Sequence, residues 1–209
     1  MNQVKICGLN DAEGYDAAQQ AGADYIGFVF YPPSPRAVTP GQAAALAARG
    51  GPARRVGLLV DASDDEIAGI LAAVPLDILQ LHGEETPARA AALRQRFGLP
   101  VMKALGIAEP ADLARLADYA PAVDMFLLDA KPPPGATLPG GNAASFDWAL
   151  LAGQAIPLPW LLAGGLTPDN VADAIAQSGA PGVDVSSGVE RARGVKDPAR
   201  IRAFIQAAR

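Results

Sequence analysis

Short runs of apolar and β-branched residues alternate along this chain with longer segments rich in alanine and charged residues. The apolar runs have the length of buried strands, and the segments between them have the length of short helices. The pattern predicts strands over residues 3–7, 24–30, 55–60, 77–81, 100–104, 124–129, 159–163 and 182–185. It predicts helices over residues 11–21, 40–48, 64–73, 86–97, 109–118, 146–153, 168–177 and 197–208.

The regular alternation of eight strands with eight helices indicates one architecture for the whole chain. Strand–helix units of this kind wind on a parallel sheet. No change in composition and no Gly/Ser linker interrupts them, so we predict a single α/β domain over residues 1–209, a closed (β/α)8 TIM barrel. An open doubly wound sheet remains the alternative, because periodicity alone does not show whether the sheet closes.

Polar residues and prolines mark several of the expected helix starts. Asp64 precedes an apolar periodic run, and Thr86 and Thr167 each precede a proline. A hydroxyl or carboxylate can cap the first turn of a helix, and proline suits its first position. We therefore expect these three residues at helix N-termini.

Two of the expected loops are long for a barrel of this size. They cover residues 31–40 and 131–145, and both are rich in proline. Each follows an expected strand, so both should lie on the rim of the barrel where such folds carry their chemistry.

Two of the expected strands end on residues that can move protons. Cys7, the single cysteine, closes the first strand in front of Gly8, and Asp129 closes the sixth. A thiol, with a reference pKa of about 8.5, can act as a base near neutral pH if a cation or a helix amino end lowers that pKa. The two are candidates for a base and an acid across the barrel mouth. The alternatives are a buried structural cysteine and an aspartate that caps the following loop.

Glycine-rich turns follow the last two expected strands. Gly164 and Gly165 come after the seventh strand, and Ser187 and Gly188 come after the eighth. Backbone N–H groups in such turns can converge on an anion, and barrel enzymes commonly hold phosphate at these two loops. The pair of turns predicts a phosphate site, with tight turns that require positive φ as the alternative.

Three further polar residues lie at expected strand ends or in the first long loop. Arg36 follows two prolines that stiffen its backbone, so it could present a guanidinium to a carboxylate or phosphate, or it could be an ordinary solvated arginine. His82, the sole histidine, could line the pocket or hold the rim, and it has no metal-ligand spacing around it, so we predict no metal. Asp184 is expected near the barrel interior in a supporting role.

Composition excludes several classes of partner. The net charge is −5 over 209 residues, without long runs of like charge, which disfavours nucleic acid and anionic membranes. One cysteine forms no internal disulfide, and neither a signal peptide nor an apolar run of about 18 residues is present. We therefore expect a cytoplasmic protein.

Taken in order, the motifs resemble those of the phosphoribosylanthranilate isomerases of tryptophan biosynthesis. The similarity spans nearly the whole chain and combines several short motifs. They are KICGL at 5–9, GADYIGFVF at 22–30, SPR at 34–36, LQLHG at 79–83, LD at 128–129, FDW at 146–148, LAGGL at 162–166, VDVSSGVE at 183–190 and GVKD at 194–197.

The resemblance implies a cofactor-free Amadori rearrangement of a small phosphosugar–anthranilate substrate. By the family's pattern, Asp129 is the general acid that opens the sugar ring and Cys7 is the general base that removes a proton from its second carbon. Arg36 would face the anthranilate carboxylate, and His82 would line the substrate site. The backbone around Gly164, Gly165, Ser187 and Gly188 would hold the phosphate.

The chain departs from the family's pattern in two places. The loop before Phe146 reads PGGNAAS at 139–145, where the family usually has a Gly-Gly-Thr-Gly run. The resemblance therefore does not say how this loop closes over the substrate. The third strand leads into Asp61, where the family more often has asparagine, which adds a possible charge on the rim.

Other readings of the same residues stay open. Another phosphosugar barrel enzyme is one, although an indole-glycerol-phosphate synthase would be expected to carry catalytic lysine and glutamate residues on early strands. A barrel that binds a phosphorylated ligand without turning it over is another, but it would not need both Cys7 and Asp129. We expect a monomer rather than a homodimer.

Overall fold

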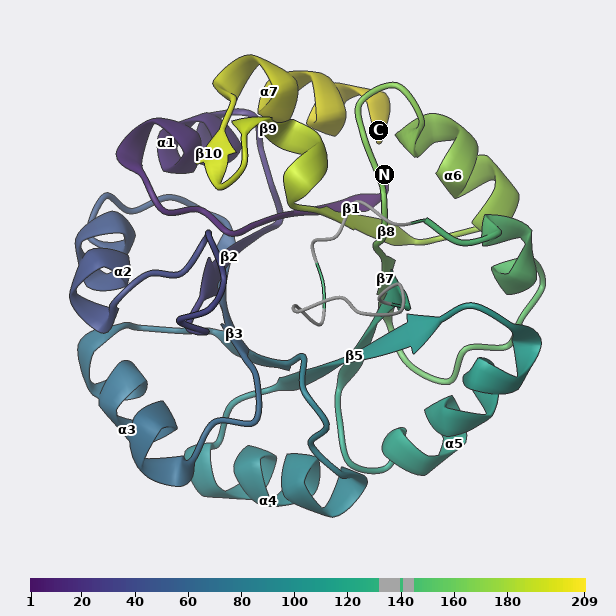
Figure 1. Ribbon diagram of the computed structural model, residues 1–209, viewed down its shortest axis with the longest axis horizontal. Coiled ribbons are helices and arrows are strands. Elements are labelled where there is room, and N and C mark those ends of the chain that lie inside the picture. Colours follow the sequence, from purple (N-terminus) through teal and green to yellow (C-terminus); the bar gives the residue numbers. More distant parts are fainter. Residues whose placement is uncertain (132–139, 141–144) are drawn as a thin grey trace.

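Eight parallel strands form a closed barrel at the centre of the molecule, with helices around it (Figure 1). A computed structural model describes residues 1–131, 140 and 145–209. Neighbouring strands follow chain order from β1 to β8, and β8 pairs with β1 in parallel register. The predicted (β/α)8 barrel is therefore confirmed, and the open-sheet alternative is wrong.

The strands and helices lie close to their expected positions. The barrel strands are β1 (Gln3–Cys7), β2 (Tyr25–Val29), β3 (Arg54–Leu59), β4 (Ile78–Leu81), β5 (Val101–Ile107), β6 (Met125–Ala130), β7 (Trp160–Leu162) and β8 (Gly182–Val185). The α-helices are α1 (Ala12–Gln20), α2 (Pro40–Ala47), α3 (Asp64–Ala73), α4 (Pro87–Phe97), α5 (Arg115–Tyr119), α6 (Val171–Ser178) and α7 (Pro198–Ala207). The 3-10 turns are η1 (Pro110–Ala114), η2 (Trp148–Leu151) and η3 (Ser187–Val189).

Two expected helices are shorter or more irregular than the sequence pattern predicts. The helix expected at 109–118 is split between η1 and α5, and the one expected at 146–153 is only the turn η2. A short antiparallel hairpin, β9 (Glu190–Ala192) with β10 (Val195–Lys196), was not expected. Its strands are too short to produce an alternating pattern that identifies a strand.

The residues that cap the helices differ in part from the expectation. Thr86 caps α4 as predicted, through a bond from the Arg89 N–H. Ser63, not Asp64, caps α3, and Asp64 is the first residue of that helix. Thr167 does not cap α6: its own N–H donates to Asn170 Oδ1 at 2.7 Å, which closes a turn before the helix begins.

Hydrophobic side chains fill both the barrel interior and the layer between strands and helices. Each barrel strand is buried along most of its length, as expected for a parallel sheet covered by helices. The interior contains an apolar layer formed by Tyr25, Val56, Ile78, Met102, Ala104, Met125, Leu127, Leu161 and Ala163. Lysine side chains at positions 5, 103 and 196 are also almost fully buried, so each requires an anionic partner.

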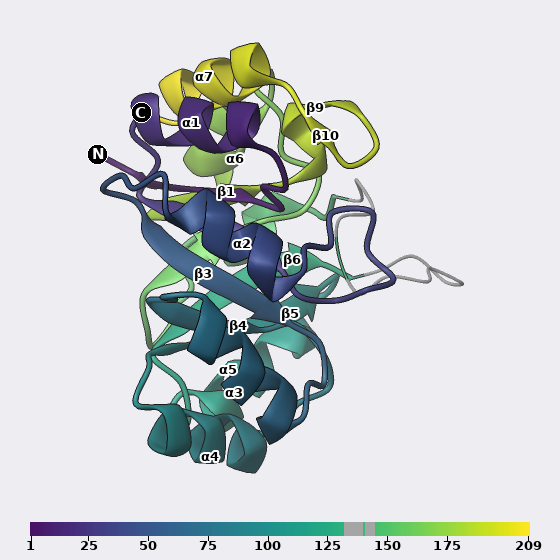
Figure 2. The ribbon, with the colours of Figure 1, turned by 90° about the vertical axis from the view of Figure 1, so that its left-hand side faces the viewer.

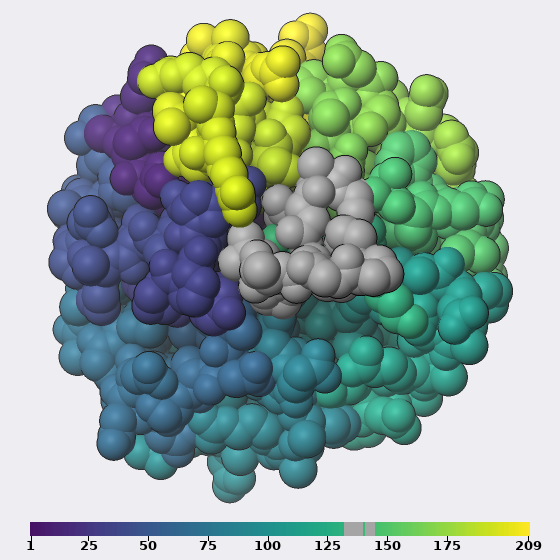
Figure 3. Space-filling view, viewed as in Figure 1, coloured from purple at the N-terminus to yellow at the C-terminus, as the bar shows by residue number. Residues whose placement is uncertain are grey.

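The carboxyl ends of the parallel strands share one rim of the barrel. Figure 2 shows the two chain termini at the opposite end, while the loop after β2 and the β9–β10 hairpin lie together at this rim. Figure 3 looks onto the same rim, where residues of the hairpin contact the loop after β2. The expected rim position of the first long loop is thus confirmed, whereas the second, at 131–145, falls mostly outside the described residues.

Candidate active site

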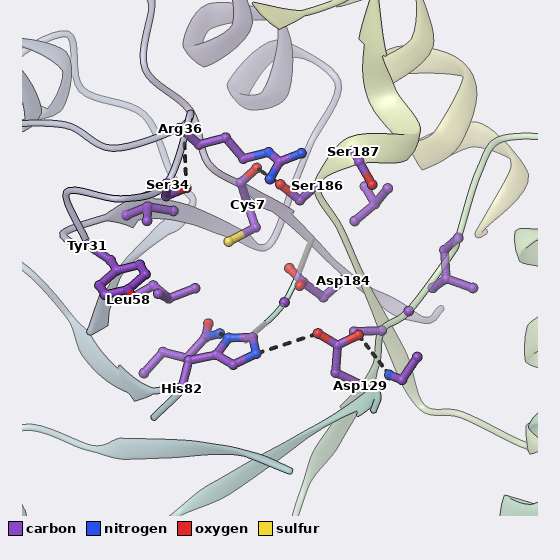
Figure 4. A pocket seen from close by; sticks show the side chains of 18 of the residues that line it. Cys7, Tyr31, Ser34, Arg36, Leu58, His82, Asp129, Asp184, Ser186 and Ser187 are labelled. Atoms are coloured by element: carbon purple, nitrogen blue, oxygen red, sulfur yellow. Dashed lines mark hydrogen bonds and ion pairs between the residues drawn. The ribbon is translucent and has the colours of Figure 1, made fainter. Parts of the chain in front are cut away.

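A cavity opens at the carboxyl ends of the strands and encloses about 820 Å³ together with its mouth. Its walls include the predicted site residues Cys7, Arg36, His82, Asp129, Gly164, Gly165 and Ser187 (Figure 4). Gly188 is the one predicted site residue that does not line it, although it directly follows Ser187.

Cys7 is presented to the cavity by the turn that ends β1. The N–H groups of Gly8 and Leu9 both donate to the carbonyl of Gly27, at 2.9 and 3.0 Å. Gly8 has a φ of +74°, a conformation that favours glycine. Cys7 is only 4% exposed. Burial raises the pKa of the Cys7 thiol, and the nearby Lys5 ammonium acts in the opposite direction.

Asp129 lies at the end of β6 and is held by its own backbone and by His82. Its Oδ1 accepts the N–H of Ala130 at 2.8 Å, and its Oδ2 lies 3.5 Å from His82 Nε2. On the other side of the ring, Gln80 Nε2 lies 3.2 Å from His82 Nδ1. The imidazole is therefore held between Gln80 and Asp129.

The turns after β7 and β8 each lie close to the backbone of another segment: Gly164 lies against Ala130, and Gly188 lies against Leu166. Gly164 and Gly165 have φ values of +90° and +64°, so the turn after β7 needs glycine, as the alternative interpretation holds for that turn. A Cβ on Gly164 would lie 2.7 Å from the Ala130 nitrogen, and one on Gly188 would lie 1.9 Å from the carbonyl oxygen of Leu166. Close approach at Gly188, rather than its φ, requires glycine there and packs the two loops together.

Arg36 is buried rather than solvated, so its interpretation as an ordinary surface arginine is wrong. Its Nε and Nη2 donate to the two carboxylate oxygens of Glu190, at 2.6 and 3.1 Å. Lys196 Nζ also donates to Glu190, at 3.0 Å. Burial alone would raise the pKa of Glu190, but its bonds with Arg36 and Lys196 outweigh burial and lower it. Among the hydrogen bonds that the structure describes, none involves Arg36 Nη1.

A second buried ion pair lies beneath Cys7. Lys5 Nζ donates to Asp184 Oδ1 at 2.8 Å, with the lysine side chain fully buried. The expected interior, supporting place of Asp184 agrees with this contact. Sequence reasoning missed Lys5, although alternate residues of a strand share a face, so Lys5 must lie on the same face as Cys7. It also missed Glu190 and Lys196, which only the unexpected hairpin brings to the site.

The described part of the chain contains no group of three or more His, Cys, Asp and Glu residues arranged to hold a metal ion. Within the same residues, no helix combines the length and the apolar character needed to cross a bilayer.

Comparison with known proteins gives one consistent family. Residues 4–207 match the family model described as N-(5'-phosphoribosyl)anthranilate (PRA) isomerase. The chain is 63% identical over 204 residues to the N-(5'-phosphoribosyl)anthranilate isomerase of Paracoccus denitrificans, covering 97% of this chain and 94% of that protein. It is 58% identical to the enzyme of the same name from Rhodospirillum rubrum, over 99% of this chain and 97% of that one.

Solved structures agree in fold. The phosphoribosyl anthranilate isomerase of Thermotoga maritima superimposes with a TM-score of 0.89 at 37% identity, covering 100% of this chain and 98% of that one. Another solved isomerase, at TM-score 0.86, 35% identity and the same coverage, holds reduced 1-(o-carboxyphenylamino)-1-deoxyribulose 5-phosphate. A further Thermotoga maritima structure, at TM-score 0.86, 36% identity and the same coverage, describes monomers generated from the dimeric enzyme.

Proposed function

The chain belongs to the family of N-(5'-phosphoribosyl)anthranilate isomerases, and on that premise we propose which of its residues carry out the reaction. As a member of the family it catalyses the Amadori rearrangement of N-(5'-phosphoribosyl)anthranilate to 1-(2-carboxyphenylamino)-1-deoxyribulose 5-phosphate, a step of tryptophan biosynthesis. The reaction is an internal oxidation–reduction: the first sugar carbon is reduced and the second is oxidised. It needs one acid and one base on a bound sugar.

Asp129 is the acid. It donates a proton to the ring oxygen of the furanose, the bond from the first carbon to that oxygen breaks, and the nitrogen lone pair forms an iminium. His82, 3.5 Å from the carboxyl and itself bonded to Gln80, positions the acid and provides a polar partner after the proton has left. This arrangement leaves the acid on the side of the cavity formed by β4 and β6 (Figure 4).

Cys7 is the base. Its thiolate removes the proton from the second sugar carbon, the electron pair neutralises the iminium, and an enolamine results. Return of a proton to the first carbon and loss of the hydroxyl proton on the second then give the ketone. The sulfur points into the cavity from β1, on a different side from Asp129 (Figure 4).

The two ends of the substrate are anionic and need separate partners. Arg36 is oriented by its bidentate bond to Glu190, so its remaining Nη1 is available for the anthranilate carboxylate. At the other end, the closely packed loops at Gly164, Gly165, Ser187 and Gly188 supply backbone N–H groups for the phosphate. A substrate bound at both ends places its sugar between Cys7 and Asp129.

One observation supports this assignment most strongly: the single cysteine and Asp129, near the end of β6, face one cavity from separate strands. The test follows the loss of substrate fluorescence with wild type, Cys7→Ser and Asp129→Asn, after circular dichroism has shown that each folds. We expect each variant to lose at least about a hundredfold in kcat, the scale of a general acid or base.

Asp124→Asn is the matched control. Asp124 lies just before β6, at the opposite end of the strand from Asp129, and bonds the Val101 N–H at 2.9 Å. Its variant should turn over at nearly the wild-type rate. Near-full activity in Cys7→Ser would remove Cys7 as the base. Tight phosphosugar binding by a folded wild type without turnover would support the non-catalytic barrel instead.

We further infer that residues 1–209 act as one catalytic domain and as a monomer in the cytoplasm. Among the described residues, Met1 is the only large hydrophobic side chain that is exposed, whereas obligate dimers bury apolar surface. The dimeric Thermotoga maritima relative makes the measurement necessary. Light scattering should give about 21.4 kDa, and a mass twice as large would contradict the monomer.

A further inference from the structure

Lys5 is a charged residue in a place where packing alone would favour an apolar one. It lies inside the barrel, two residues before Cys7 and on the same face of β1, and its side chain is fully buried. Removing an ammonium from water costs several kcal/mol unless a well-placed anion compensates. Asp184 compensates in part, with its Oδ1 2.8 Å from Lys5 Nζ.

The Lys5 ammonium and the Cys7 sulfur both lie against one glycine of β2, Gly27. A Cβ added to Gly27 would lie 2.9 Å from Cys7 Sγ and 3.3 Å from Lys5 Nζ. Any larger residue at this position would therefore occupy the space that the two groups share. An ammonium has three N–H donors, and among the described residues Asp184 is the only hydrogen-bond acceptor found for this one. The sulfur lies where it can serve as a further partner.

The charged groups around Cys7 come from five different segments of the chain. Lys5 on β1, Lys196 on β10 and Arg36 in the loop after β2 are cations, and Asp184 on β8 and Glu190 on β9 are anions. The three cations exceed the two anions by one, so ionisation of the thiol would bring this buried group to neutrality. Across the cavity lie Asp129 and His82, which pair with each other.

Individual groups act on the thiol in opposite directions. Burial raises the pKa of Cys7 most strongly, the charge of Lys5 lowers it, and the charge of Asp184 raises it. The effect of Lys196 is again to lower the pKa. The ion pair beneath Cys7 therefore does not act as a neutral unit, because its cationic end is the one that meets the sulfur over Gly27.

We propose that Lys5 is a positioning residue for the catalytic base, whose ammonium stabilises the Cys7 thiolate, and that Asp184 limits how much of this positive charge the sulfur experiences. The inference rests on the proposed role of Cys7. It adds the source of the charge that lets a buried thiol ionise. Lys5 and Asp184 should thus have opposite effects on the thiol, although they form one ion pair.

The test is a pH titration of the ultraviolet absorbance of the thiolate. Cys7 is the only cysteine, and a Cys7→Ser protein provides the blank that removes the contribution of the tyrosines. The proteins compared are wild type, Lys5→Met, Asp184→Asn and the double variant. Lys5→Met should raise the titration midpoint by about one pH unit or more, a tenfold loss of thiolate. Asp184→Asn should lower the midpoint, because the sulfur becomes the only anionic partner of the ammonium.

The double variant should titrate between wild type and Lys5→Met, since it loses the stronger lowering effect and the weaker raising one. It also carries no unpaired buried charge, so it keeps the test informative if Lys5→Met does not fold. Equal midpoints in all folded variants, or a shift of both single variants in the same direction, would overturn the inference. A merely structural role for Lys5 predicts equal midpoints.

The titration separates this inference from the proposed function. If the midpoints follow the expected order but Cys7→Ser retains full turnover, Lys5 controls the thiol and the thiol is not the base. If Cys7→Ser loses turnover and the midpoints do not move, Cys7 remains the base and Lys5 does not tune it. In the variants that turn over, the acidic limb of kcat/KM against pH should move with the midpoint.

Discussion

A buried ion pair next to His82 holds the rim where the ends of β3, β4 and β5 meet. Lys103 Nζ lies 2.8 Å from Glu85 Oε2 and donates to the Gly83 carbonyl at 2.6 Å. The side chains of Lys103 and Glu85 are 1% and 3% exposed. The same carboxylate accepts the N–H groups of Asp61 and Gly83, at 2.8 and 2.9 Å. One charged pair thus fixes the backbone that presents His82.

We expect Lys103→Met to lower the free energy of unfolding by about 3–5 kcal/mol, because it leaves the buried Glu85 carboxylate without its counter-ion. The two hydrogen bonds lost are each worth about 1.5–3 kcal/mol when a charged group is involved. Methionine replaces most of the lysine volume, so cavity formation adds little. For a chain of this length, the loss corresponds to a fall in Tm of about 6–20 °C.

Equilibrium urea unfolding followed by circular dichroism measures this loss. Two variants serve as controls. Lys103→Met combined with Glu85→Leu should be less destabilised than Lys103→Met alone, since no unpaired charge remains. Arg96→Met removes a cation from the exposed surface of α4, where Arg96 pairs with Asp64, and should cost less than about 1 kcal/mol. A loss below about 1 kcal/mol for Lys103→Met would refute the reasoning.

Two further predictions concern the turn at Gly188 and the ion pair of Glu190 with Arg36. Gly188→Ala would place a Cβ 1.9 Å from the Leu166 carbonyl oxygen, so the loops after β7 and β8 must separate, and we expect KM to rise by about tenfold or more. Gly69→Ala is the control: it lies at an open position of α3 and should add about 0.5–1 kcal/mol of stability. A KM for Gly188→Ala equal to that of wild type would contradict the first expectation. The lowered pKa of Glu190 contributes stability that is complete above its ordinary value of 4.5 and is lost as pH falls through the folded-state value. Glu190→Gln should therefore narrow the difference in Tm between about pH 6 and about pH 3, and an unchanged difference would show that the bonds with Arg36 do not stabilise the fold.

The barrel could be predicted because strands that are buried on both faces consist of continuous apolar runs. Such runs can be recognised from a few neighbouring residues of the sequence. Most strand boundaries agree with the structure to within one or two residues. An exception is β5, which continues to Ile107 because Gly106 and Ile107 still pair with Asp129 and Ala130. The helix expected at 146–153 is wrong because composition alone does not distinguish a helix from the short turn η2.

The site could be predicted only where strand ends determine it. Parallel strands bring Cys7, His82 and Asp129 to one rim whatever the details of packing, so their shared cavity follows from topology. The pairing of Arg36 with Glu190 does not, because it joins residues 154 positions apart through a hairpin with almost no sequence signal. The roles of Cys7, Asp129 and Arg36 in catalysis stay predictions until the variants are measured.

The closure of the barrel has a consequence for the order in which the site is built during synthesis. β1 is made first, but its pairing with β8 joins Lys5 to Asp184, 179 positions later. Before β8 has been made, one edge of β1 is unpaired. Lys5 then still lacks Asp184, the anion that compensates its charge in the folded protein. Contacts over such separations form late. In a growing polypeptide the surroundings of Cys7 are therefore complete only after β8 has been made and has closed against β1.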